Sequence, residues 1–485
     1  MICARYCLCI TRKPACWAAI FFSALFLSLI MEAGHCAQAQ ARISCPDCNV
    51  ILVSLDTLRA DALGIYGCRS DTSPNIDRLA ATGAVFLNAY SQSPNTLPSH
   101  MSIFTSQYPW THEVENLFRD RLPSKTLTLP MVFKKHGYHT VWAANLDAMG
   151  INLSAGFERG CNEFISSDPM RGRRMKITWG SAFSWLEKNR NRKFFMFLHT
   201  YLIHDPYMPE KSSILRFSRF IPPEKNITGK KMYLQILGKA VSEPLRLFKE
   251  MRSTGFYSAF GRLQRDVFWK YFDLNSPEDI AYIRTLYDAV VFEADMAIGA
   301  LYARLEDLGL AEKTLLIITS DHGEEFMEHG RVSHTQVYNE HLHVPLIFIL
   351  PGKHAGIKPA QIVQSIDIMP TILELAGLPA PEGTEGRSLV PLMKGGKPDV
   401  NAMAFARWRV NYSVRDSRRT YIRKNKCPNR SINQDRRCMT EEFYDRSVDP
   451  TEKKNIFTSN RHAAEKFSKR LDGMIKSAGK GGENP

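Results

Sequence analysis

The chain has 485 residues, of which 44% are hydrophobic and 23% are charged, and its formal net charge at pH 7 is +14. This composition is typical of a globular protein with one large and one smaller domain, or two to three modest ones, and it excludes extensive disorder outside a tail at 478–485. Positive charge permits nucleic-acid binding, but the sequence contains no motif typical of a nucleic-acid-binding domain, so we expect no specific nucleic-acid binding.

The N-terminus has the order of a secretory signal. Basic residues precede an apolar run from Ala15 to Met31, and the small-residue triplet Ala37-Gln38-Ala39 follows. We therefore expect a signal peptide at 1–39 and an exported protein, periplasmic or extracellular. A retained membrane anchor is the alternative, because the apolar run is at the lower limit for spanning a bilayer.

Six cysteines would remain after cleavage, and an even number in an exported chain favours disulfides. Cys427 and Cys438 flank a polar loop and are the best candidate pair. Cys45 and Cys48 are expected to form a local structural disulfide rather than a redox or zinc site, because no second Cys-x-x-Cys motif is present.

The first predicted strand is the apolar run from Asn49 to Leu55. Such a continuous run is typical of a strand that is buried on both faces. It ends at Asp56, and open α/β sheets bind their ligands at the carboxyl ends of such strands. Arg59 and Asp61 follow, and we expect them to form a structural ion pair.

The segment Ser93–Ser106 contains a predicted helix start. Leu97, Met101 and Phe104 recur at helical spacing, which places Thr96 at or beside the N-cap. Free N–H groups and the helix dipole favour an anion at that position. Taken alone, an ordinary helix cap is the alternative.

Strands and helices alternate along the rest of the chain. Strands are predicted at 138–144, 194–200, 314–319, 344–350 and 362–366, and helices at 127–135, 278–308 and 370–376. This alternation predicts an α/β fold with a mostly parallel central sheet flanked by helices. From residue 400 onward, short alternating segments and one amphipathic helix predict a small C-terminal subdomain, 400–477, with an antiparallel sheet and a helix.

Ligand-type side chains follow three of the predicted strands. They are Asp56, His204 and the pair Asp321-His322, and a helix start adds Thr96. Carboxylates and neutral imidazole bind divalent ions such as Ca²⁺, Mn²⁺, Mg²⁺ or Zn²⁺. A hydroxyl beside such an ion loses its proton more readily and becomes a nucleophile. Each residue alone has a structural alternative, in a turn or a capped loop, but their combination favours a metal-assisted site.

These motifs resemble the sulfatase family of the alkaline phosphatase superfamily. The matching segments are Asp56-Thr-Leu-Arg-Ala-Asp, Ser73-Pro-Asn-Ile-Asp, Thr96-Leu-Pro-Ser-His, Ser320-Asp-His-Gly-Glu and Val344-Pro-Leu-Ile. The resemblance implies a catalytic domain at 48–399 and one divalent metal ion. It also implies that Asp56, Asp321, His322 and Thr96 hold the metal, that Thr96 is the covalent nucleophile, and that His204 and His334 contact the transferred group.

The sequence departs from sulfatases at the positions that activate the nucleophile and hold sulfate. Thr96 stands where sulfatases have a cysteine or serine that becomes formylglycine, and His100 replaces an arginine. Asn145 lies at the position of a sulfate-binding lysine. The resemblance therefore implies that His100 and Asn145 contact the substrate. A second metal is not expected, because the loop after His204 lacks the extra Asp-x-x-x-His.

A threonine nucleophile changes the expected chemistry. Its ester cannot collapse to an aldehyde, so water or an alcohol must attack the tetrahedral centre, which is ordinary for phosphorus. We therefore predict a metal-dependent hydrolase or transferase that acts on phosphate or phosphodiester esters. An arylsulfatase-like sulfuric ester hydrolase and a catalytically inactive binding protein are the alternatives.

Residues 210–272 form a basic and aromatic insertion. They contain thirteen Lys or Arg and five Asp or Glu, interleaved with aromatic residues. A solvated insertion packed on the domain is one interpretation. The other is a lid that contacts an anionic membrane surface or an acidic glycan. The expected partner of the site is an anionic phospho- or sulfo-ester, carried by a lipid or a glycan.

Overall fold

The computed structural model describes residues 43–116, 119–144, 155–165, 175–218, 229–254, 256–352, 356–397, 399, 402–425 and 439–479. The chain divides into two units, Met1–Ser44 and Cys45–Pro485, and every element below belongs to the second. Asn145, Cys427, Cys438 and the predicted signal peptide lie outside the described residues. Within the described ranges, no helix is long and apolar enough to cross a membrane.

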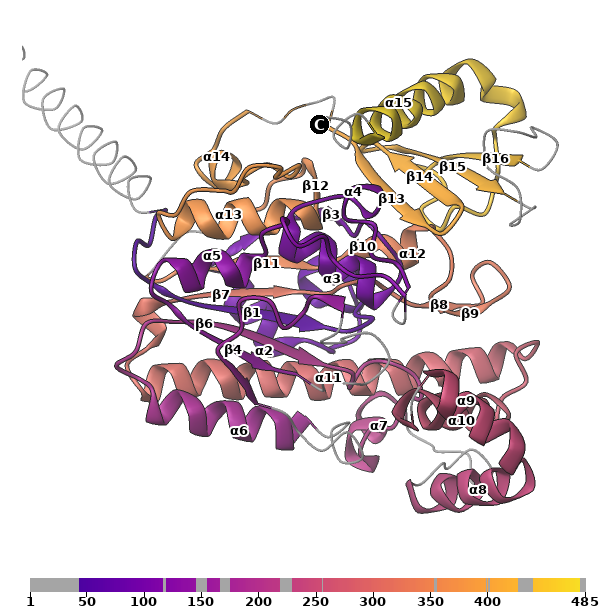
Figure 1. Ribbon diagram of the computed structural model, residues 1–485. Helices are drawn as coiled ribbons and strands as arrows, with labels where there is room; N and C mark the ends of the chain where they lie inside the picture. Colours follow the sequence, from indigo (N-terminus) through magenta and orange to yellow (C-terminus); the bar gives the residue numbers. More distant parts are fainter. Residues whose placement is uncertain are drawn as a thin grey trace, which may run out of the picture. The chain divides into compact units, whose positions relative to one another are not determined.

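A seven-stranded sheet forms the centre of the molecule, with strand order β2-β11-β7-β1-β6-β4-β5 (Figure 1). Its strands are β1 (Asn49–Leu55), β2 (Ala84–Val85), β4 (His139–Ala143), β5 (Glu163–Ile165), β6 (Phe194–Thr200), β7 (Thr314–Thr319) and β11 (Leu346–Ile349). β1 pairs in parallel with β6 and β7, and β4 in parallel with β5 and β6. β11 runs antiparallel to β7 and β2. The predicted mostly parallel sheet is therefore confirmed, with an antiparallel edge.

Helices cover both faces of this sheet. The larger ones are α2 (Pro74–Ala80), α3 (Thr96–Thr105), α5 (Leu129–Lys135), α6 (Met175–Lys188), α11 (Pro277–Asp307) and α13 (Ile368–Leu375). Figure 1 shows α6 and α11 on one face and α3, α5 and α13 on the other. The long helix α11 begins where the Ser276 side chain accepts a hydrogen bond from the Asp279 N–H, with Pro277 in its first turn.

The strand predicted at 344–350 is wrong in one respect: it is two strands in two sheets. β10 (His343–Val344) belongs to a three-stranded sheet with β3 (Asn88–Tyr90) and β12 (Ile362–Gln364), whereas β11 joins the central sheet. Pro345 lies between them, and proline has no N–H to donate to a continuous ladder. A two-stranded hairpin, β8 (Glu325–Phe326) and β9 (Val332–Ser333), follows the β7 loop.

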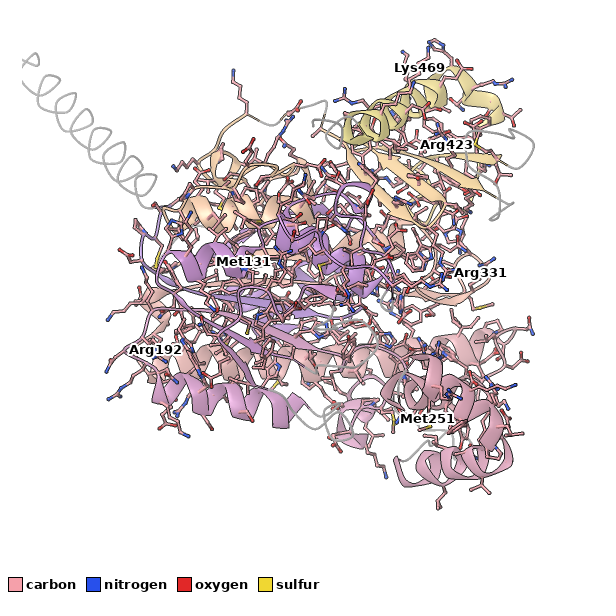
Figure 2. The ribbon with its side chains drawn as sticks, viewed as in Figure 1. Met131, Arg192, Met251, Arg331, Arg423 and Lys469 are labelled. Atoms are coloured by element: carbon pink, nitrogen blue, oxygen red, sulfur yellow. A yellow bond between two sulfur atoms is a disulfide. The ribbon has the colours of Figure 1, made fainter. Side chains whose placement is uncertain are left out.

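The C-terminal part forms the predicted antiparallel sheet and helix. Its strands β13 (Ala404–Trp408), β14 (Asn411–Arg415), β15 (Arg419–Asn425) and β16 (Met439–Asp445) pair in sequence order, and α15 (Arg461–Gly479) packs on them. Arg423, labelled in Figure 2, donates from β15 to Asp472 Oδ1 and Ser468 Oγ of α15, both at 2.7 Å. The predicted tail at 478–485 begins inside α15, so residues 478 and 479 are helical.

The insertion is helical where it is described. It comprises α7 (Lys211–Phe217), α8 (Gly229–Ser242), α9 (Pro244–Thr254) and α10 (Phe256–Trp269), and Figure 1 shows the last three grouped beside one end of α11. The short elements are α4 (Pro109–His112), α12 (Asn339–Leu342), α14 (Val390–Met393) and 3₁₀ turns at Ala60–Ala62, Gly64–Tyr66, Ala311–Lys313, Ser365–Asp367 and Thr458–Asn460. Cys45 and Cys48 form the predicted disulfide.

Candidate active site

Three ligand-type side chains meet where β1 and β7 end. Asp56 follows β1, Asp321 and His322 follow β7, and all three are fully buried. Their candidate ligand atoms lie within 4.8 Å of one another. Asp56 Oδ1 and Asp321 Oδ2 are buried without a hydrogen-bond partner. Because unpaired buried carboxylate oxygens are costly, this pocket fits a cation.

The electrostatics of the pocket point the same way. Burial raises the pKa of Asp56 well above its usual range, and repulsion from Asp321 and Glu324 raises it further. Burial also lowers the pKa of His322, so its imidazole is neutral at pH 7. Burial alone would raise the pKa of Asp321, but the neighbouring histidines, His322 first, hold it below the usual value. Two carboxylates and a neutral imidazole are a donor set for one divalent cation.

Thr96 places its hydroxyl against this pocket. It is the first residue of α3, with Asn95 at the N-cap, and it is 2% exposed. Its Oγ1 lies 3.4 Å from Asp56 Oδ2 and 3.3 Å from His322 Nε2. Ser99, one turn later, donates to the Asp321 carbonyl oxygen at 2.6 Å and so fastens the helix to the β7 loop.

His100 lies differently from the expectation that it contacts substrate. Its Nε2 is 2.9 Å from Ser54 Oγ, and its Nδ1 is 2.8 Å from the Thr96 carbonyl oxygen. The side chain is fully buried, so both ring nitrogens are engaged within the protein. In the structure His100 holds the first turn of α3 on β1, and thereby positions Thr96.

His204 and His334 face each other beside the pocket. His204 Nδ1 lies 2.8 Å from both the carbonyl oxygen and Oδ1 of Asp205, and His334 Nδ1 lies 3.0 Å from the Pro94 carbonyl oxygen. Both Nδ1 atoms therefore carry hydrogen, and the two Nε2 atoms meet at 3.2 Å. Two lone pairs at that distance repel, so the contact requires one proton between them.

Asp205 stabilises that proton. Burial alone would raise its pKa, but its hydrogen bond with His204 and the adjacent positive charges lower the pKa to about 2. Trp269 Nε1 of α10 donates to Asp205 Oδ2 at 2.7 Å, and Arg265 Nη1 lies 3.9 Å from Oδ1. The insertion therefore reaches the active-site loop. Burial lowers the pKa of His334 well below its usual value.

Sequence reasoning did not single out two further site residues. His199, inside the apolar run of β6, places Nε2 3.3 Å from Asp56 Oδ2. Glu324 directly follows the Asp-His-Gly motif and is fully buried, with both oxygens unpartnered. Burial and the charge of Asp205 raise the pKa of Glu324 well above its usual range. The position of Glu324 directly after the Asp-His-Gly motif could have indicated a site residue. Nothing in the apolar sequence of β6 distinguishes His199.

The fold and this site define a class: an α/β protein with a buried hydroxyl beside a metal-type pocket at the carboxyl edge of its sheet. Comparison with known proteins identifies the family. The family model described as "Sulfatase" matches residues 48–378, and the model described as "N-sulphoglucosamine sulphohydrolase, C-terminal" matches residues 327–477. The chain belongs to the sulfatase family.

Named relatives and solved structures agree with that assignment. Arylsulfatase K from Bos taurus is 30% identical over 364 residues, covering 71% of this chain and 65% of the relative, which is less than two thirds of its length. Arylsulfatase K from Gallus gallus is 26% identical over 483 residues, covering 92% and 86%. The phosphonate monoester hydrolase of Agrobacterium radiobacter has a TM-score of 0.67 at 20% identity, covering 89% and 96%. A structure in complex with its substrate D-glucosamine-2-N,6-O-disulfate has a TM-score of 0.68 at 20% identity, covering 89% and 98%.

Proposed function

We propose that the protein is a metal-dependent hydrolase of anionic esters in which Thr96 is the covalent nucleophile. The observation that carries this proposal is the position of Thr96 Oγ1, within 3.4 Å of Asp56 and His322, beside two unpartnered carboxylate oxygens. A divalent ion held by Asp56, Asp321 and His322 would supply positive charge that favours the Thr96 alkoxide and the charge of the transferred group.

The residues of the chain account for the remaining steps. Thr96 releases its hydroxyl proton to solvent, and its Oγ1 then forms a bond to the sulfur or phosphorus centre while the bond to the leaving oxygen breaks. His204 gives the proton at its Nε2 to that leaving oxygen. The neutral His204 then takes a proton from a water molecule, whose oxygen bonds to the sulfur or phosphorus centre while the bond to Thr96 Oγ1 breaks. The product leaves, the Thr96 oxygen is freed and His204 is protonated again. His334, whose Nε2 lies 3.2 Å from that of His204, holds the His204 ring in place for both transfers.

A sulfuric ester is the substrate class that we put first. The relatives are named arylsulfatases, and one structural neighbour contains a disulfated glucosamine, so the comparisons favour the sulfuric-ester alternative over the phosphate prediction. A phosphate mono- or diester is the second candidate, and the specific observation in its favour is Thr96 itself. Threonine has no formylglycine route, and displacement by water is easier at phosphorus than at sulfur.

One experiment tests the proposal and separates the two classes. The protein is first treated with a chelator to remove bound metal. It is then assayed with nitrophenyl sulfate, nitrophenyl phosphate and bis-nitrophenyl phosphate after addition of Ca²⁺, Mg²⁺, Mn²⁺ or Zn²⁺. Activity should be lost in Thr96→Ala and retained in Thr105→Ala, because Thr105 lies at the far end of α3 and bonds the Met101 carbonyl oxygen. Mass spectrometry of acid-quenched protein should find the modified Thr96 peptide. No turnover of any ester, or equal activity in Thr96→Ala, would refute the proposal.

The location of the activity is a separate proposal. If residues 1–39 are cleaved, the enzyme acts in the periplasm or outside the cell. Sequencing the N-terminus of the protein recovered from its expressing cells tests this, and an intact Met1 would contradict cleavage.

A further inference from the structure

Helices α8 and α9 of the insertion both expose large apolar side chains. Leu234 and Val241 of α8 are 59% and 78% exposed, and Leu245 and Phe248 of α9 are 78% and 59% exposed. These are four of the eight large hydrophobic side chains that are exposed in the described part of the chain. Such a concentration on two short helices marks an interaction surface, because scattered single residues would need no explanation.

Basic residues lie among these apolar side chains. On α9, Lys249 and Arg252 are exposed and follow Leu245 at helical spacings of four and seven, so they share its face with Phe248. Between residues 229 and 254 the sequence has six Lys or Arg and two Glu. We call Leu234, Val241, Leu245, Phe248, Lys249 and Arg252 the insertion face; Met251, labelled in Figure 2, marks the position of α9.

The basic side chains of this region divide into two groups. Lys239 and Arg246 contact Asp266 of α10 at 3.0 and 3.2 Å, so they fasten α8 and α9 to the rest of the insertion. Lys249 and Arg252 instead lie beside the apolar side chains of the insertion face. The structure therefore presents protruding apolar groups flanked by exposed positive charge on a helical support.

We propose that the insertion face docks on an anionic lipid surface. Apolar side chains inserted at the acyl boundary, with Lys and Arg at the level of the headgroups, are the arrangement by which amphipathic helices bind membranes. Charge complementarity selects anionic lipid, and the exposed Val and Leu side chains select an apolar phase, which an acidic glycan does not offer. This proposal is independent of the proposed ester hydrolysis, and its test needs no turnover.

Docking would also set the place of the active site. Helix α10 packs against both α8 and α9. The same helix carries Trp269, whose Nε1 donates to Asp205 in the active-site loop. The insertion face and the acid–base residues are therefore joined through one helix, which would bring the pocket to the membrane surface.

The test measures binding of the full chain to phosphatidylcholine vesicles with and without phosphatidylglycerol, by co-sedimentation at low and high salt. We expect binding that needs phosphatidylglycerol and weakens with salt. Leu245→Ser combined with Phe248→Ser should weaken binding about tenfold or more. Lys249→Glu combined with Arg252→Glu should weaken it to a similar extent, about tenfold.

Matched controls lie elsewhere on the surface. The apolar control is Val448→Ser, because Val448 is 81% exposed and lies in the C-terminal part. The charge control is Arg387→Glu, because the Arg387 side chain is 86% exposed. Both should bind vesicles like the wild type, and all variants should keep the wild-type melting temperature. Equal binding by wild type and insertion-face variants would overturn the proposal, because another segment would then carry the binding. Absence of binding would overturn it too, as would a dimer that Leu245→Ser dissociates in sedimentation velocity.

Discussion

Asp56→Asn should stabilise the metal-free protein and abolish its stabilisation by divalent ions. In the structure Asp56 and Asp321 are fully buried, and their candidate ligand atoms lie within 4.8 Å of one another. Asparagine has nearly the same shape, removes the negative charge, and can donate a hydrogen bond to the unpartnered oxygen of Asp321. Asp56→Asn therefore removes both the repulsion between the carboxylates of Asp56 and Asp321 and one ligand of the cation site.

The magnitude follows from that distance. Two unit charges no more than 4.8 Å apart repel by at least about 3.5 kcal/mol at an effective dielectric constant of 20. For a unit as long as Cys45–Pro485, the entropy of unfolding is about 0.9 kcal/mol per kelvin, so the metal-free variant should melt about 4 °C above the metal-free wild type. An ion at one hundred times its Kd would stabilise the wild type by about 2.7 kcal/mol, or about 3 °C.

The pH dependence has a definite sign. In the metal-free folded state the pKa of Asp56 is raised well above its usual value of 3.8, so the folded state binds the proton more tightly than the unfolded state. Stability is therefore lost as pH rises from 3.8 through the raised pKa, and Asp56→Asn removes that loss. Differential scanning fluorimetry between pH 5 and 8, with chelator or with added Ca²⁺, Mg²⁺, Mn²⁺ or Zn²⁺, measures all three effects. A wild type that no ion stabilises, or a variant that ions stabilise equally, would refute the reasoning.

Three further predictions concern the acid–base pair, the β7 loop and a buried carboxyl. Asp205→Asn should slow cleavage of esters with poor leaving groups by about 100-fold and of nitrophenyl esters much less, because it weakens the proton donor; equal losses in kcat for both would contradict this. Gly323→Ala should destabilise the fold by about 1–3 kcal/mol in chemical denaturation, since its Cβ would lie 2.0 Å from the Glu340 carbonyl oxygen, whereas Gly473→Ala meets nothing within 4 Å and should be harmless. Burial raises the pKa of Asp367 to about 6, so it costs about 3 kcal/mol as pH rises from 4 to 7, and Asp367→Asn should flatten that slope in urea titrations; an unchanged slope would count against it.

The central strands were predictable because burial on both faces leaves a clear pattern. The bounds of β1, β6 and β7 match the apolar runs from which they were predicted. Their parallel pairing then brings their carboxyl ends to one edge, which is why Asp56 and Asp321 could be expected to meet. The helices α8 to α10 were not assigned from the sequence, although Ala259, Leu263 and Val267 of α10 recur at a spacing of four and are buried, which is the pattern of a helix packed on a core.

The role of His100 shows the limit of transferring a position from a family motif. The arginine that it replaces has a longer side chain with several donors, whereas the imidazole four residues after Thr96 contacts the Thr96 carbonyl oxygen and Ser54 and lies 3.7 Å from Asp321 Oδ2. His199 was missed for the opposite reason. It lies in an apolar strand, and only the register of β6 beside β1 brings it to Asp56.

The charges of the pocket imply an order in which its parts act. Asp56 and Asp321 present only negative charge to an incoming anionic ester, and the nearby Glu324 adds a third buried carboxyl group. Positive groups lie beside the pocket, where His204 contacts His334 and Arg265 lies 3.9 Å from Asp205. An anionic ester can therefore approach Thr96 only after the two carboxylates have been neutralised. The residues that would hold the cation would thus control access to the proposed nucleophile as well as its reactivity.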